Sequence, residues 1–364
     1  MRVSGVRHSG GVDLPVNPPV EPMLAKAAGA VPAQPDGEPA WLYEPKWDGF
    51  RCIVFRDGDE VELGSRGTKP LTRYFPEVVA AVLAELPPRC VVDGELFVPQ
   101  PGGGRLAWDL LSQRIHPAAS RVEKLAVETP AQFVAFDLLA LGDEDLTSRP
   151  AGERRERLVA ALAGCGPVTH VTTATSDAAV AADWFTRFEG AGLDGVVAKP
   201  LGEPYRPKER VMTKVKHRRT ADCVVVGYRL HKSLPGIGSM LLGLHTDDGV
   251  VSVGGAAAFT AARRVELLEL LQELRTGDEP AQGEKNRWNA RRDDSWIPVR
   301  NELVCEVEYD QLEGRRFRHN PRFLRWRPDK EPGQCRLDQL DVPADYDLTD
   351  VLSGAAGASA GGSR

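Results

Sequence analysis

The chain has 364 residues, which predicts two domains at roughly 100 to 200 residues each, and its 42% hydrophobic and 27% charged residues exclude a mainly disordered protein. No apolar run approaches the ~18 residues of a membrane span and no signal peptide opens the chain, so we expect a cytoplasmic protein without a membrane partner. The net charge of −6 weighs against a nucleic-acid partner unless basic residues gather in particular segments.

An α+β fold is predicted from the order of the elements. Residues 1–20 are expected to be a flexible N-terminal segment, and residues 21–218 the first domain. Within that domain a hairpin is expected around Asp57-Gly58, because this pair tolerates the positive φ of tight turns. Ser176 is the expected cap of one helix and Gly190 its stop. The expected strands are 50–56, 60–66, 89–98, 132–141, 193–200 and 211–216, and the expected helices are 74–86, 150–163 and 176–190.

The sequence pattern changes near residue 219. Short strands with glycine turns and one amphipathic helix at 260–274 predict a small β-barrel over residues 219–345, such as an oligonucleotide-binding (OB) fold. Residues 346–364 are rich in Ala, Gly and Ser and are expected to be disordered. The six cysteines are far apart and form no C-x-x-C pair, which predicts reduced core thiols and gives no support for a zinc site.

Lys46 is the first candidate for chemistry, because it stands between Glu44, a tryptophan and the pair Asp48-Gly49. A free lysine amine has a pKa of about 10.4, so a nucleophilic lysine needs help from its surroundings. An isolated K-x-D-G sequence by itself favours a surface ion pair beside a turn. The interpretation of Lys46 therefore depends on the charged residues elsewhere in the chain.

Charged residues spaced two apart recur on the expected strands. Asp93 and Glu95 place two carboxylates on one face of an otherwise apolar strand, which suits Mg²⁺ or Mn²⁺. Lys214 and Lys216 share a face of another strand, where they would bind phosphate and lower the pKa of a nearby lysine. Asp194 opens a third strand. Three such strands are hard to explain as structure alone.

Basic residues gather in two runs, 208–219 and 313–330, the second of which also contains Phe317, Phe323 and Trp326. Such runs are usually solvated faces, but two of them could form a groove for a nucleic-acid backbone. The chain has no phosphate-binding G-x-x-x-x-G-K-[ST] loop and no G-x-G-x-x-G opening a helix. A bound nucleotide would therefore be held by side-chain lysines and a metal, which fits attack of Lys46 on an α-phosphate with pyrophosphate leaving.

Seven segments stand in the order typical of covalent nucleotidyltransferases, and the chain resembles the ATP-dependent DNA ligases, most of all the small bacterial ligase C type. These segments are KWDGFR, SR at 65–66, DGEL, AFDLL, DGVVAK, TKVK and RPDK. The resemblance covers roughly residues 20–340, with PPVEPMLAK included. It implies an adenylation domain with antiparallel sheets and flanking helices, followed by an OB-fold domain.

The resemblance also implies roles for single residues. Lys46 would form a phosphoramidate with AMP, and Glu95 and Asp194 would serve the Mg²⁺ or Mn²⁺ ion. Position 194 holds aspartate where many relatives have glutamate. The residues implied to bind ATP are Glu44, Arg51, Arg66, Glu95, Phe136, Lys214, Lys216, Arg327 and Lys330.

The implied activity is the sealing of nicks between 3′-hydroxyl and 5′-phosphate ends, through lysyl-AMP and an adenylylated DNA end, in DNA repair. The implied partner is nicked double-stranded DNA, other repair proteins are left open, and we expect a monomer. An RNA ligase or RNA-capping nucleotidyltransferase remains the alternative, and a catalytically silent nucleic-acid-binding module is the alternative from another class. An NAD-dependent ligase would carry a nicotinamide-binding region before the lysine and a four-cysteine zinc site. The sequence shows neither feature, so we expect ATP and not NAD as the nucleotide.

Overall fold

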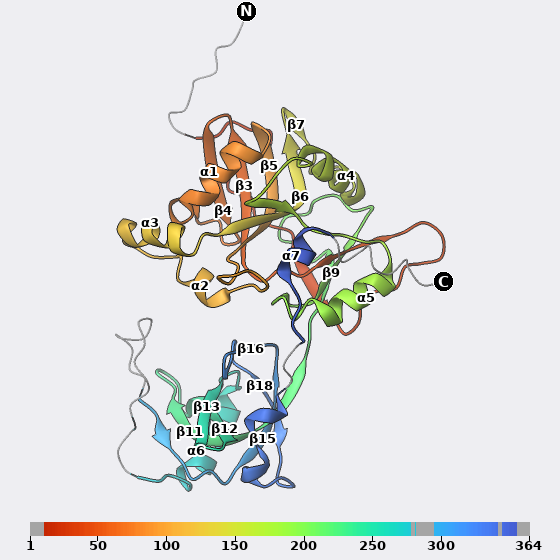
Figure 1. Cartoon of the computed structure of the whole chain (residues 1–364). Helices are drawn as coiled ribbons and strands as arrows, with labels where there is room; N and C mark the ends of the chain where they lie inside the picture. Colours follow the sequence, from red (N-terminus) through yellow and green to blue (C-terminus); the bar gives the residue numbers. More distant parts are fainter. Residues whose placement is uncertain (1–10, 278–280, 282–294, 341–343, 355–364) are drawn as a thin grey trace, which may run out of the picture. The chain divides into compact units, whose positions relative to one another are not determined.

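The structure, a computed structural model, describes residues 11–277, 281, 295–340 and 344–354. These residues form two compact units, one within residues 1–216 and 343–364 and the other within 217–342 (Figure 1). We call them unit 1 and unit 2. Within the described ranges, none of the helices has both the length and the apolar character that a membrane span requires.

The larger sheet of unit 1 carries the hairpin and two of the expected strands. Its strand order is β4-β3-β5-β6-β7, with β8 parallel to β6. Gly58 has a φ of 62° at the turn between β3 and β4, which confirms the Asp57-Gly58 hairpin. The strands are β3 Phe50–Asp57, β4 Glu60–Ser65, β5 Arg89–Phe97, β6 Gln132–Leu141, β7 Glu144–Asp145 and β8 Thr169–Val171.

The second sheet of unit 1 joins segments that are far apart in the sequence. Its order is β1-β10-β9-β2, so the strand that leads into Lys46 pairs with the strand that follows Asp194. The same sheet places β10, which contains Lys214, beside β9. The strands are β1 Ala25–Ala28, β2 Trp41–Pro45, β9 Val196–Pro200 and β10 Met212–Val215.

Helices cover these sheets in unit 1. The three expected helices are present, although the cap of α5 is Asp177 and not Ser176, because the Asp177 carboxylate accepts hydrogen bonds from the backbone of Ala179 and Val180. This helix also ends at Arg187, before Gly190. The helices are α1 Pro76–Glu85, α2 Trp108–Ser112, α3 Ala119–Glu128, α4 Ala151–Ala161, α5 Ala178–Arg187 and α7 Leu348–Leu352.

Both ends of the described chain pack on unit 1, which corrects two expectations. Residues 11–20 were expected to be flexible, yet Leu14 is buried in a cluster with Phe55. Residues from 346 onward were expected to be disordered, yet α7 buries Leu348 and Val351 in a cluster that includes Trp184. The apolar residues of α7 have helical spacing, a short signal that the surrounding Ala/Gly/Ser composition masks. The rest of the expected tail, 355–364, and residues 1–10 lie outside the described residues.

Unit 2 is built on an antiparallel sheet of order β13-β12-β11-β15-β18, with β14 paired to β11. The single expected helix is α6 Ala261–Gln272, and its residues Leu267 and Leu271 pack into the core of the unit. The strands are β11 Arg219–Leu230, β12 Ile237–Thr246, β13 Gly249–Ala256, β14 Ile297–Pro298, β15 Val304–Tyr309, β16 Leu312–Glu313, β17 Arg316–Phe317 and β18 Arg322–Trp326.

All six cysteines are free thiols, as the sequence predicts. Five are buried and Cys165 is half-buried. Burial raises the pKa of the Cys90 thiol to about 12, so this group stays protonated and unreactive at neutral pH. The cysteines of the described chain are therefore part of the cores.

Candidate active site

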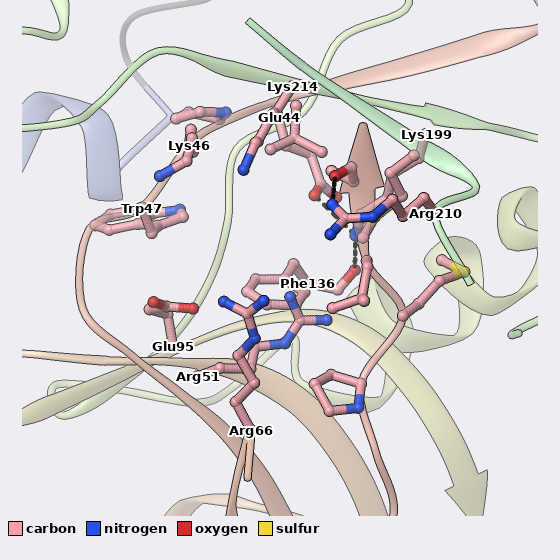
Figure 2. Close-up of a pocket in the computed structure, with 17 residues that line it drawn as sticks. Glu44, Lys46, Trp47, Arg51, Arg66, Glu95, Phe136, Lys199, Arg210 and Lys214 are labelled. Atoms are coloured by element: carbon pink, nitrogen blue, oxygen red, sulfur yellow. Dashed lines mark hydrogen bonds and ion pairs between the residues drawn. The ribbon is translucent and has the colours of Figure 1, made fainter. Parts of the chain in front are cut away.

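A pocket in unit 1 gathers most of the predicted nucleotide-binding residues (Figure 2). Cationic side chains outnumber carboxylates on its walls, which suits a polyanionic ligand such as a nucleoside triphosphate. Lys46, Trp47 and Glu95 lie on one side of the view in Figure 2, and Lys199 and Arg210 on the other. The predicted residues that line it are Glu44, Lys46, Arg51, Arg66, Glu95, Phe136 and Lys214.

Lys46 is fixed by the backbone at the end of β2. Its N–H donates to the carbonyl of Gly195 over 2.8 Å, and its carbonyl accepts from the N–H of Asp194 over 3.0 Å. Lys46 Nζ lies 2.7 Å from Asp194 Oδ2, and Lys216 Nζ lies 2.5 Å from the same oxygen. Burial would raise the pKa of Asp194, but the two lysines outweigh it and hold that pKa below its usual value. Asp194 thus bridges two cations at the pocket.

Two glycines permit the close approaches around Lys46. Gly195 has a φ of 126°, and a Cβ there would lie 1.9 Å from the carbonyl oxygen of Val215. A Cβ on Gly49 would lie 2.0 Å from the carbonyl oxygen of Leu96. Gly49 instead donates its N–H to Glu95 Oε1 over 3.2 Å. The glycine of the K-x-D-G sequence therefore brings Glu95 next to the Lys46 loop.

The carboxylates of β5 have two different partners. Asp93 is fully buried and accepts two hydrogen bonds of 2.6 Å from Arg51, together with one of 2.7 Å from Tyr205 Oη. It therefore orients Arg51 and does not face the pocket. Glu95 lines the pocket, and loss of hydration raises its pKa to about 7, although Arg51 and Lys46 oppose this shift. A carboxyl group with a perturbed pKa in a pocket is a candidate functional residue.

Phe136 lies near the centre of the view in Figure 2, with the Arg51 guanidinium 4.4 Å from its ring centroid. Glu44 is buried beside it, and its Oε2 lies 2.8 Å from Lys199 Nζ. Lys199 also donates to the carbonyl of Phe136 over 2.7 Å. An aromatic ring and a buried acid next to each other can stack on a flat base and bind its polar edge.

Three of the pocket residues labelled in Figure 2 were missed as nucleotide contacts by sequence reasoning. Lys199 ends the quoted segment DGVVAK, and Arg210 lies in the first basic run, so both stood in segments that were already noted. Trp47 is buried, and its Nε1 donates to Thr172 Oγ1 over 2.8 Å, which anchors the Lys46 loop. Burial, with Lys216 and Lys46 nearby, lowers the pKa of Lys214.

Arg327 and Lys330 belong to unit 2, where a single carboxylate holds both. Arg327 Nη1 lies 3.0 and 3.1 Å from the two oxygens of Asp222, and Lys330 Nζ lies 2.5 Å from Asp222 Oδ2. Arg327 also donates to Asp329, which lowers the pKa of Asp329 to about 2. Asp222, which sequence reasoning did not select, is the partner of both cations of the RPDK segment.

Residues of the second basic run, 313–330, lie in two kinds of place in unit 2: some pack in its core and others lie on its surface. Its aromatic residues Phe317, Phe323 and Trp326 pack in or against the core of unit 2, so they are structural. Arg322 and Arg325 pair with Glu308 and Glu306 of β15. A wide groove on unit 2 is lined by other basic and polar groups, among them Arg229, Arg315, Arg316, Arg318 and His319.

Residues 22–216 match the family described as the ATP dependent DNA ligase domain, and residues 234–330 match the ATP dependent DNA ligase C terminal region. This chain belongs to the ATP-dependent DNA ligase family. DNA ligase C1 of Mycolicibacterium smegmatis is 56% identical, with 94% of this chain and 99% of the relative covered. DNA ligase C of Mycobacterium tuberculosis is 54% identical over the same shares.

A solved structure from a study of Lig E DNA ligases has a TM-score of 0.53 at 17% identity, covering 84% of this chain and 99% of that one. This likeness supports the fold, an adenylation domain and an OB-fold domain. The predicted family, fold class and enzyme class are confirmed, and the chain is a DNA ligase that uses ATP. The relatives do not favour the RNA ligase or capping alternative.

Proposed function

We propose that Lys46 is the nucleophile of this ATP-dependent DNA ligase. In the first step a bond forms between Lys46 Nζ and the α-phosphorus of ATP, the bond from that phosphorus to the bridging oxygen of pyrophosphate breaks, and Nζ loses a proton. The observation that carries this proposal is the convergence of Lys46, Lys216 and Asp194 beside a cation-rich pocket. Negative charge that develops on phosphate oxygens is stabilised by such fixed cations.

The other residues predicted to bind ATP fall into four groups, according to the part of ATP that each would contact. Phe136 and Glu44 would contact the base, Phe136 by stacking and Glu44 through its carboxylate. Arg51 and Arg66 would hold ribose and phosphate, with Arg51 oriented by Asp93. Lys214 and Lys216 would contact the α-phosphate. Arg327 and Lys330, after release from Asp222, would contact the departing pyrophosphate.

A divalent ion fits the donor set of Glu95 and Asp194 only together with a nucleotide. Within the described ranges, no group of three or more His, Cys, Asp or Glu side chains is arranged to hold a metal. Mg²⁺ is commonly held by one or two carboxylates together with substrate phosphates. We infer that Glu95 and Asp194 supply the carboxylates and ATP the rest, and the ion, Mg²⁺ or Mn²⁺, would neutralise phosphate charge.

We infer that nicked double-stranded DNA is held in part by the groove of unit 2, through the arginines that line it. AMP then passes from Lys46 to the 5′-phosphate, and the 3′-hydroxyl displaces AMP. We propose that a monomer does this in DNA repair, in the cytoplasm where the bacterial chromosome lies. The first step and the later steps need different contacts with unit 2, so we expect a hinge near residues 217–223, the segment in which β11 begins at Arg219.

Nick sealing by the purified protein with ATP, NAD and GTP in parallel tests this proposal. A DNA duplex with one labelled 5′-phosphate at a nick is the substrate, and a matched RNA duplex is the control. Sealing of DNA with ATP and divalent ion supports the proposal. Sealing that prefers RNA, or that needs NAD, would contradict it.

A further inference from the structure

Lys199 is a buried cation that touches both base-contacting groups of the pocket. Its exposed fraction is 4%, and Nζ lies 2.8 Å from Glu44 Oε2 and donates to the Phe136 carbonyl over 2.7 Å. The same ammonium lies 4.7 Å from the centroid of the Phe136 ring. Burying a lysine is costly unless it is paired, and here each contact of the ammonium is with a group at the base end of the pocket.

These contacts join the two sheets of unit 1. Glu44 lies on β2 and Lys199 on the adjacent strand β9, while Phe136 lies on β6 of the other sheet. The distance between the acid and the ring is therefore set across a sheet-to-sheet junction. One short, charge-assisted cross-link at that junction fixes how the acid lies relative to a base stacked on the ring.

The Glu44 carboxylate is left with one unused oxygen. Among the groups that the structure describes, Oε2 pairs with Lys199, whereas the buried Oε1 accepts no hydrogen bond. Arg155 Nη1 lies 3.8 Å from Oε1, and this nitrogen also has no hydrogen-bond partner within the described residues. A buried acceptor without a donor is costly, and a donor supplied by a ligand removes that cost.

We propose that Lys199 is a positioning residue for base selection, an inference that rests on the proposed ATP chemistry at Lys46. By occupying Oε2, Lys199 leaves Oε1 to accept from the exocyclic amine of adenine while the base stacks on Phe136. A purine with oxygen at that position offers an acceptor in place of a donor, and an unsubstituted purine offers nothing. Lys199 thus acts through Glu44 and the Phe136 backbone, without touching the phosphates.

The test compares ATP with the triphosphate of unsubstituted purine riboside, which lacks only the amine. The measured quantity is kcat/KM for covalent labelling of Lys46, in wild type, Lys199→Met and Glu44→Gln. Lys124→Met, on the exposed face of α3, is the matched control. We expect wild type to prefer ATP by roughly ten- to 100-fold, the worth of a hydrogen bond to a charged group. Lys199→Met should lose most of this preference, chiefly through a higher KM for ATP.

A double-mutant cycle separates positioning from general support of the fold. If Lys199 acts through Glu44, adding Lys199→Met to Glu44→Gln changes the ATP preference little. A merely structural role would lower the melting temperature and slow labelling by both nucleotides equally, and that result would overturn the inference. If the losses of ATP preference in the two single variants multiply in the double variant, the two residues act independently, and that result would also overturn the inference.

Two further results keep the test decisive. If Lys199→Met does not fold, Lys199→Arg replaces it, because the longer planar guanidinium cannot reproduce both ammonium contacts. A preference for ATP below wild type then supports the inference, and an unchanged preference overturns it. Failure of the wild-type protein to form any Lys46 adduct would instead overturn the proposed chemistry, which distinguishes the two failures.

Discussion

Each unit contains one aspartate that bridges two cations. In unit 1 Asp194 holds Lys46 and Lys216, and in unit 2 Asp222 holds Arg327 and Lys330. The difference lies in what the cations can do. Lys46 lines the pocket of unit 1, where a lysine that loses its proton can attack phosphorus, whereas Arg327 of unit 2 stays charged and can only stabilise an anion.

The ion pairs of Asp194 and Asp222 are thus similar in structure but differ in their proposed chemistry. We infer that both aspartates hold cations in place until the phosphates of ATP replace them as partners. In unit 1 this releases a nucleophile, and in unit 2 it releases positive charge for a leaving group.

Replacing Lys46 should remove the chemistry of unit 1 altogether. Lys46→Ala removes the proposed nucleophile, and Lys46→Arg should fail equally because arginine stays protonated. We expect covalent labelling by α-labelled ATP to be abolished in both, while Lys124→Ala labels normally. Label that persists in Lys46→Ala, on Lys199 or Lys26 for example, would refute the assignment.

Lys330→Ala should affect one step and spare the others. Pyrophosphate leaves only in the first step, so loss of a cation proposed to contact it should slow self-adenylylation by roughly 10²- to 10³-fold. Sealing of a nick whose 5′-phosphate already carries AMP should stay within a few-fold of wild type. The two single-turnover rates decide the matter, and equal losses in both would mean that Lys330 supports only folding or DNA binding.

The two bridging aspartates should differ when each is changed to asparagine. Asp194→Asn acts at the proposed nucleophile and the proposed metal, so we expect losses of roughly 100-fold in every step. Asp222→Asn leaves both cations of unit 2 in place, and we expect a loss of about tenfold, confined to the first step. Rates for ATP and for pre-adenylylated nicks measure both, and the reverse ranking would break the comparison.

DNA binding should depend strongly on salt. About five lysine or arginine contacts with phosphate imply a slope near −4 to −5 in a plot of log affinity against log salt concentration. Changing Arg316 and Arg318 in the unit 2 groove to alanine should reduce the slope by about one to two. Titrations of nicked DNA at several salt concentrations provide the measurement, and a slope near zero would assign both basic runs to solvated faces.

Glu95 should make stability depend on pH. Its pKa of about 7 exceeds the ordinary value of 4.5, so the folded protein keeps a proton that the unfolded chain loses between these two pH values. The free energy of unfolding therefore falls as pH rises through this interval. Glu95→Gln should raise the melting temperature by a few degrees at pH 8 and less at pH 5, while Glu123→Gln on α3 changes neither. A gain that is larger at pH 5 would contradict the raised pKa.

Much of the architecture was predictable because it depends on local patterns. The Asp57-Gly58 turn, the helical spacing of α1 and the apolar runs of β5 and β6 need only neighbouring residues. The family followed from seven ordered segments, and the comparisons confirm it. Elements with weak local signals were misjudged, as α7 shows, because its helix is stabilised by burial of Leu348 and Val351 against unit 1.

The sequence by itself determined which residue types gather in each motif, and hence the family and the candidate nucleophile. Only the tertiary structure decided the partners, because ion pairs form between strands that are distant in the chain. Asp93 orients Arg51, and Asp194 bridges two lysines. Asp222 holds the cations of the RPDK segment. Lys199 became visible as a link between sheets only when β9 and β6 were placed. The spacing of residues in the sequence shows only which side chains share one face of one strand. The site is formed by side chains from several strands, whose relative positions the spacing does not give.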